Sequence, residues 1–167
     1  IDVLHNNVGG QGTGRSLANI TLDDWNEMMA LNITSAMLSC RQVVPHMVRQ
    51  GGGAIVNIAS ILGLRTIGQV APYNASKAGL IHLTRALAME WARYNIRINA
   101  ICPGYIETEI NREYFHSEGG KKLVDMLPRK RVGKPEDLDG LMLLLAADES
   151  RFINGAIMTA DDGMAAF

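Results

Sequence analysis

The sequence predicts an α/β protein built on a parallel sheet with helical crossovers. Short apolar runs rich in β-branched residues, which are typical of buried strands, alternate with longer segments whose apolar residues recur at helical spacing. Polar residues or a proline–glycine pair follow the first three runs closely, and such strand ends meet at one edge of a parallel sheet. The four expected strands are residues 2–6, 55–58, 96–101 and 155–160.

The composition is that of an ordinary globular chain. Its 167 residues suit a single domain, residues 1–167, with enough apolar side chains to bury a core. Sixteen basic and seventeen acidic side chains give a net charge of -1 without a basic patch, which argues against nucleic-acid binding. No apolar run is long enough to span a membrane and no secretory signal is visible, so we expect a cytoplasmic location and no membrane partner.

Cysteine and histidine spacing gives no sign of a metal site. Cys40 and Cys102 lie far apart in apolar segments and are expected to be reduced core residues, although the sequence alone leaves a disulfide open. The four histidines have no metal-ligand spacing. We therefore expect no bound metal.

A glycine-rich stretch, residues 9–16, follows the first expected strand. It nearly matches the phosphate loop G-x-x-x-x-G-K-S/T, with Arg15 in place of lysine. A phosphate loop requires a helix to begin at once, so that its N-terminal amides face the phosphate. Here the better helix start is Thr21, with Asp24 three residues later in a capping pattern. We expect a flexible loop, with nucleotide binding through a phosphate loop as an alternative.

Residues 22–49 are expected to form one long helix, because apolar side chains recur at helical spacing throughout. Pro45 is the place where this helix would kink or begin a new turn. Asn32 lies in the apolar middle of the segment, where the simplest interpretation is a core asparagine bonded to backbone.

The second expected strand ends close to Ser60, and the next helix, residues 72–94, carries Tyr73 and Lys77 one turn apart on one face. A free tyrosine has a pKa near ~10, but an ammonium group one turn away favours the phenolate. A serine hydroxyl facing the same point can hold a substrate oxygen while a proton moves. Together the three side chains suit proton transfer to or from an alcohol or carbonyl oxygen.

Pro103 and Gly104 end the third expected strand, and glycine lets the backbone approach a ligand closely. Residues 105–127 are polar and weakly periodic, so we expect short helices that form a mobile substrate flap. A helix over residues 138–147 and the last strand complete the order β-α-β-α-β-flap-α-β. This order matches the four adjacent strands on one side of the switch point in a Rossmann-type doubly wound sheet, where ligands bind at strand carboxyl ends.

Five linked motifs give the chain its resemblance to a known family. They are Asn6-Asn7-Val8-Gly9, Asn32, Ser60, Tyr73-x-x-x-Lys77, and Pro103-Gly104 with Thr108 after it. In order and spacing the chain resembles the short-chain dehydrogenase/reductases, and most nearly their 3-oxoacyl-carrier-protein reductase and sugar or cyclic alcohol dehydrogenase branches. The resemblance implies an NAD(P)-dependent oxidoreductase that interconverts a secondary alcohol and a ketone by hydride transfer.

The resemblance also implies a role for each matched residue. Tyr73 would be the general acid/base, Ser60 would polarise the substrate oxygen, Lys77 would lower the tyrosine pKa, and Asn32 would support the proton relay through a water. Residues along the strand ends would hold NAD or NADP: Asn6, Val8, Gly9, Tyr73, Lys77, Pro103, Gly104, Ile106 and Thr108. The substrate would be a small alcohol or ketone, and the helices around Asn32 and Tyr73 would form a homodimer or homotetramer.

The chain departs from the family at its beginning. Family members open with a strand and a glycine-rich turn for the cofactor pyrophosphate, and this sequence has no such opening. We therefore expect a truncated dinucleotide-binding domain that holds only the C-terminal, active-site half of the sheet. One interpretation is an alcohol dehydrogenase or carbonyl reductase, and the alternative is a non-catalytic fragment that binds dinucleotide poorly. A third keeps the family but uses Tyr73 and Lys77 for epimerisation or dehydration.

Overall fold

The computed structural model describes residues 1–12 and 14–166, so Thr13 of the glycine-rich stretch lies outside the described residues, as does Phe167. Within that part of the chain, parallel strands form one sheet in the order β1-β2-β3-β4. The strands are β1 (Val3–Asn6), β2 (Gly53–Ile58), β3 (Ile96–Pro103) and β4 (Ile157–Ala160). The predicted α/β fold with a parallel sheet is confirmed.

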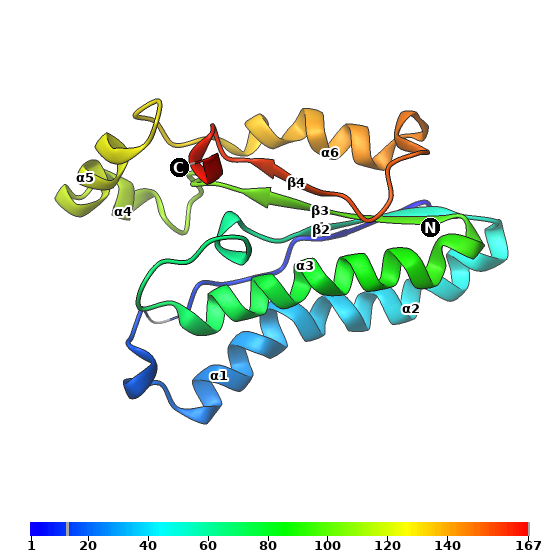
Figure 1. Ribbon diagram of the computed structural model, residues 1–167, viewed down its shortest axis with the longest axis horizontal. Coiled ribbons are helices and arrows are strands. Elements are labelled where there is room, and N and C mark those ends of the chain that lie inside the picture. The colour runs from blue at the N-terminus through cyan, green and yellow to red at the C-terminus, as the bar shows by residue number, and fades with distance from the viewer. Residues whose placement is uncertain (13, 167) are drawn as a thin grey trace.

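Helices cover both faces of the sheet (Figure 1). One face carries α2 (Ser35–Gln50) and α3 (Ala71–Trp91), and the other carries α6 (Asp139–Ala146). Helix α1 (Leu22–Met29) and the π-helical segment η2 (Ala30–Thr34) pack against α3. The short helices expected within residues 105–127 are α4 (Arg112–His116) and α5 (Glu118–Met126), which lie beyond the carboxyl ends of β3 and β4. Short helical turns are η1 (Leu17–Asn19), η3 (Ile61–Gly63), η4 (Ala92–Tyr94), η5 (Pro135–Leu138), η6 (Asp148–Ser150) and η7 (Met164–Ala166).

The long helix expected over residues 22–49 changes its winding at a different place from the one expected. Pro45 lies inside α2 without ending it. The π-helical turn falls instead around Asn32, and such turns are frequent at functional sites. The predicted capping box is present, with Asp24 N donating to Thr21 Oγ1 at 3.1 Å and Thr21 N donating to Asp24 Oδ2 at 3.0 Å.

The central strands β2 and β3 are buried on both faces, which explains why they are apolar runs and do not alternate, whereas β1 and β4 are partly exposed. Successive side chains of a strand point to opposite faces. Ile55 accordingly packs in the cluster beneath α2 and α3, whereas Val56 packs with Leu145 of α6. Cys40 and Cys102 are buried free thiols, as predicted.

Candidate active site

The carboxyl edge of the sheet gathers the residues predicted to lie at strand ends. Asn6 is the last residue of β1, Ser60 lies two residues after β2, and Pro103 is the last residue of β3. A Cβ atom on Gly104 would lie 2.8 Å from Asp161 Cα, so only glycine lets β3 run this close to the turn after β4.

The first two turns of α3 place Tyr73 and Lys77 on the buried face of the helix, where they are 8% and 4% exposed. The Ser60 side chain accepts from Leu62 N at 3.1 Å and lies close enough to Tyr73 to lower the pKa of the tyrosine. Lys77 Nζ lies 5.8 Å from the centre of the tyrosine ring and donates to Ile58 O at 2.9 Å. The structure thus brings Ser60, Tyr73 and Lys77 into one place.

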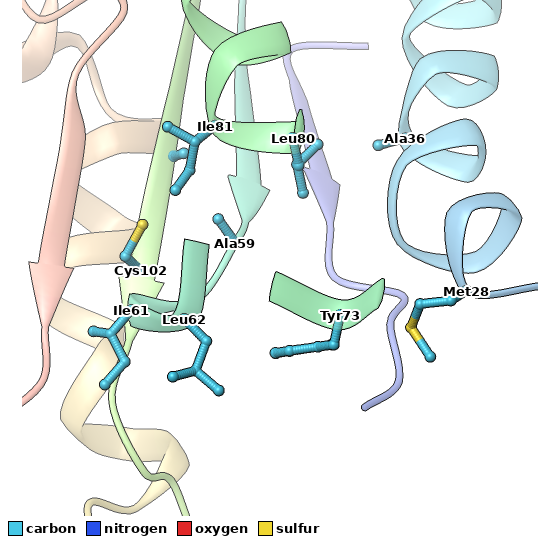
Figure 2. Close-up of a cluster of buried hydrophobic side chains, with 10 residues drawn as sticks. Met28, Ala36, Ala59, Ile61, Leu62, Tyr73, Leu80, Ile81 and Cys102 are labelled. Atoms are coloured by element: carbon cyan, nitrogen blue, oxygen red, sulfur yellow. The ribbon is translucent and has the colours of Figure 1, made fainter. Parts of the chain in front are cut away.

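Apolar side chains surround the tyrosine (Figure 2). The ring points from α3 toward Ile61 and Leu62 of η3, on the side where Cys102 of β3 also lies. Met28 of α1 lies on the opposite side of Tyr73. Such a setting excludes water and strengthens any electrostatic interaction within it.

Burial sets the acid–base properties of this pair. It raises the pKa of Tyr73 above its usual value, and the nearby Ser60 side chain offsets only part of that effect. Burial also lowers the pKa of Lys77 to about 8. Lys77 is not among the groups that account for the raised pKa of Tyr73, so its effect on the tyrosine stays a prediction.

Asn32 connects the glycine-rich loop to α3. Its Oδ1 accepts from Gly10 N at 3.0 Å, and its Nδ2 donates to Gly10 O at 2.9 Å and to Ser76 Oγ at 3.1 Å. Ser76 Oγ in turn donates to Tyr73 O at 2.8 Å. The simple interpretation of Asn32 as a core asparagine bonded to backbone therefore describes part of its environment, and the bond to Ser76 adds a link to the helix that carries Tyr73.

Gly9 lies against the same group of side chains. A Cβ atom there would come within 2.8 Å of Asn32 Oδ1 and 3.1 Å of Lys77 Nζ. The lack of a side chain at Gly9 therefore lets the loop after β1 reach Lys77.

The other residues predicted to bind cofactor are spread along the edge. Asn6 turns inward and donates to Asn57 Oδ1 at 2.8 Å, whereas Val8 is 66% exposed. Ile106 and Thr108 follow β3, where Ile106 forms a parallel bridge with Gly133 and Thr108 N donates to Asn111 Oδ1 at 2.7 Å. These residues share one edge but do not converge on one point.

Three buried polar residues near the site did not emerge from the sequence. Ser76 links Asn32 to Tyr73, while Asn57 accepts from Asn6 and donates to Thr84 Oγ1 at 2.9 Å. The sequence signal for these residues was a polar side chain inside an apolar run, because a buried polar group needs a hydrogen-bond partner. The run does not show which residue that partner is, since the partner comes from another element.

The phosphate-loop alternative finds no support in the described residues. After the glycine-rich stretch comes the short turn η1, and α1 begins only at Leu22, so no helix N-terminus follows the loop directly. Across residues 1–12 and 14–166, no group of histidine, cysteine or acidic side chains is arranged to hold a metal ion. No helix in the same part of the chain is long and apolar enough to cross a membrane.

The chain is similar to known proteins over nearly its whole length. The family described as enoyl-(acyl carrier protein) reductase matches residues 1–165. The 2-dehydro-3-deoxy-D-gluconate 5-dehydrogenase of Escherichia coli is 38% identical over 165 residues, which cover 98% of this chain and 65% of that protein. The 3-oxoacyl-(acyl-carrier-protein) reductase of Thermotoga maritima is 36% identical over 164 residues, which cover 98% of this chain and 66% of that protein.

A solved structure is similar over the whole chain. The gluconate 5-dehydrogenase of Burkholderia cenocepacia, crystallised with NADP and tartrate, matches with a TM-score of 0.94 and 33% identity, covering 100% of this chain and 66% of that one. This chain thus spans about two thirds of the length of the relatives it matches.

Proposed function

Because the chain belongs to the short-chain dehydrogenase/reductase family, we propose that it carries the active site of an NAD(P)-dependent oxidoreductase acting on a secondary alcohol and its ketone. The observation that supports this most is the meeting of Ser60, Tyr73 and Lys77 at the carboxyl edge of the sheet. The names of the relatives, which are dehydrogenases and reductases, favour the same reaction class.

In this proposal Tyr73 donates its proton to the carbonyl oxygen during reduction and takes it back during oxidation. Ser60, whose side chain lies near Tyr73, polarises the same oxygen. Lys77 has a pKa of about 8 and can therefore exchange a proton near neutral pH. Asn32 holds the loop after β1 against α3, because it bonds to Gly10 of the loop and to Ser76 of the helix. This contact keeps the loop in place beside Tyr73 and Lys77.

NAD or NADP is the cofactor in this proposal, and it supplies or accepts the hydride. Two features of the carboxyl edge leave space for such a ligand. Gly9 has no side chain beside Lys77, and the preceding residue, Val8, is exposed. Pro103, Gly104, Ile106 and Thr108 are the residues that would hold the other end. The relatives whose structures contain NADP support the choice of cofactor.

Two further features belong to the proposal. A second copy of the chain pairs through α2 and α3 to form a homodimer or homotetramer. The protein works in the cytoplasm, where a reducing environment keeps thiols such as Cys40 and Cys102 free.

Tyr73→Phe tests the proposed chemistry. It removes the proton donor but keeps the ring, so hydride transfer should fall by at least ~100-fold while the circular dichroism spectrum stays the same. Tyr94→Phe, which changes a ring in η4 beyond the other end of α3, is the matched control and should keep full activity. The measurement is the oxidation of NADH and NADPH with a panel of ketones.

The outcomes separate the interpretations. A Tyr73→Phe variant with a near-normal rate would show that another group moves the proton. A folded wild-type protein that transfers hydride to no ketone, and oxidises no alcohol, would favour the non-catalytic alternative.

A further inference from the structure

The flap leaves the sheet and returns to it at one point. Gly133 N donates to Tyr105 O at 2.8 Å, and Glu107 N donates to Gly133 O at 2.8 Å, which forms a parallel bridge between Ile106 and Gly133. The segment that contains α4 and α5 is therefore a closed loop whose returning arm extends to Gly133, beyond the expected end at residue 127. Such a loop can move as a unit about its base.

Two arginines of the returning arm bind one carboxylate outside the flap. Arg129 Nη1 lies 2.8 Å from Asp162 Oδ1, and Arg131 Nε lies 2.9 Å from Asp162 Oδ2. Arg131 Nη1 also lies 3.9 Å from Asp137 Oδ2. Each oxygen of Asp162 thus takes a different arginine, and the pairs form a small network in place of one isolated bridge.

Asp162 sits on a turn that is fixed independently of the flap. Asp161, just before it, accepts from Gly163 N at 3.1 Å and from Ala165 N at 2.5 Å. Arg65, which follows η3 and therefore Ser60, donates to Met164 O. The flap is accordingly tied, through Asp162, to a turn that is itself tied to the loop after Ser60.

The backbone of Asp162 is in the left-handed region, with φ of 58°. Residues other than glycine adopt this conformation at a cost, and such outliers concentrate at functional sites. The residue with this backbone conformation, Asp162, is also the one whose carboxylate binds both Arg129 and Arg131.

A cavity of about 200 Å³ lies between this turn and the base of the flap. Tyr105, Ile106, Leu127, Arg131, Asp162 and Met164 are among its lining residues. Met164 also packs against the cluster that contains Tyr73. Arg131 and Asp162 therefore line a cavity that also contacts Met164, and Met164 packs against the residues around Tyr73.

We propose that Asp162 is a positioning residue that holds the flap in place, through Arg129 and Arg131, for substrate binding. The inference rests on the proposed function, in which the flap covers the substrate. A released flap must be ordered again when substrate binds, so its loss of order raises KM. The kcat changes less, because the hydrogen bonds and ion pairs of Asp162 are with Arg129 and Arg131 and none is with Ser60, Tyr73 or Lys77.

The test compares Asp162→Asn with Glu118→Gln. Asparagine tolerates the left-handed backbone and has nearly the same shape, but it cannot form the ion pairs. Glu118→Gln also removes one negative charge, from an ion pair with Lys121 at 3.1 Å that lies wholly within α5. Asp162→Gly is the second variant, since glycine adopts this backbone freely and guards against misfolding.

Amide hydrogen exchange of residues 106–132 is the first readout. We expect exchange in Asp162→Asn and Asp162→Gly to speed up by roughly three- to tenfold, the size typical of losing a few surface ion pairs, across the whole segment, and any change in Glu118→Gln to stay within α5. Added salt should speed exchange in the wild type and not in Asp162→Asn, because salt screens exposed charges.

Steady-state kinetics is the second readout, and KM should rise about as much as exchange while kcat stays within about twofold. Unchanged flap exchange in both Asp162 variants would overturn the inference. Faster exchange with an unchanged KM would also overturn it, because the flap would then not serve substrate binding. A wild type that transfers no hydride would refute the proposed function, while the exchange readout would still decide whether Asp162 holds the flap.

Discussion

Lys77 is the residue whose charge responds most to its surroundings near neutral pH. Its side chain is almost fully buried, and its pKa is lowered to about 8, with burial as the main cause. A buried ammonium group loses hydration that a single bond to Ile58 O does not fully replace. The same burial that brings Lys77 into a useful pKa range therefore makes it a source of instability.

Lys77→Met should remove a pH dependence of stability. The unfolded lysine keeps its proton up to pH ~10.4, whereas the folded lysine loses it near 8. Between these values the unfolded state binds more protons, so this group makes the wild-type unfolding free energy rise with pH. Relative to Lys77→Met, the rise should be about 3 kcal/mol, because one pKa unit is worth about 1.4 kcal/mol.

Urea unfolding of both proteins from pH 7 to 10.5 measures this difference. The thiol of Cys40, whose pKa burial raises to about 11, titrates in both proteins and cancels in the comparison. Cys102, whose pKa burial also raises to about 11, loses the nearby charge of Lys77 in Lys77→Met, so its titration is part of the difference. Lys122→Met changes an exposed lysine and should leave the wild-type profile unaltered. Parallel profiles for wild type and Lys77→Met would contradict the burial argument.

At the scale of elements, the C-terminus of α6 is bound by the guanidinium group of Arg97, a residue of β3. Arg97 of β3 donates from Nη1 to Leu145 O at 3.0 Å and to Ser150 Oγ at 2.6 Å, and from Nη2 to Ala147 O at 3.1 Å. The last carbonyls of a helix have no partners within it, and its C-terminus carries partial negative charge. Arg97 supplies both the donors and the opposite charge, and so joins α6 to the sheet.

Arg97→Met should cost about 2 kcal/mol of unfolding free energy, since hydrogen bonds from charged groups contribute about 1.5–3 kcal/mol. Amides near the C-terminus of α6 should exchange faster, because the carbonyls of Leu145 and Ala147 lose the donors that hold this end of the helix. Arg93→Met is the control, because Arg93 lies over the Tyr94 ring without binding a helix end. Equal stability of the two variants in urea would show that Arg97 adds nothing to α6.

The whole molecule leaves apolar side chains on the outer sides of α2 and α3. Met37, Leu38 and Val48 of α2 are partly exposed, and Met89 of α3 is 84% exposed. These two helices lie side by side on one face of the sheet (Figure 1). Their outer surface is the one through which we propose that two copies associate.

Leu38→Glu should weaken this association at least tenfold, because a carboxylate would be buried without a partner at the interface. Leu38 is 40% exposed, so the substitution should leave the fold of the single chain intact. Sedimentation velocity over a range of concentrations measures the effect. Ile110→Glu, at a flap residue that is 96% exposed, is the control and should associate like the wild type. A monomeric wild type would end the proposal.

Features that depend on neighbours along the chain were predictable from the sequence. The apolar runs marked the strands, and Thr21 with Asp24 marked the start of α1. The spacing of Tyr73 and Lys77 placed both on one face of a helix, and the order of elements placed Ser60 at the same edge. Each of these follows from backbone geometry over a few residues, together with the rule that parallel strands end on one side.

Features that depend on distant partners were decided only by the tertiary structure. The helical spacing around Asn32 did not predict its hydrogen bonds to Gly10 and Ser76. The sequence of the turn after β4 likewise did not predict the ion pairs of Asp162 with Arg129 and Arg131. The pKa of Lys77 belongs to the same group. Burial and long-range contacts arise from how elements pack, and packing places side chains together that the local pattern leaves dozens of residues apart.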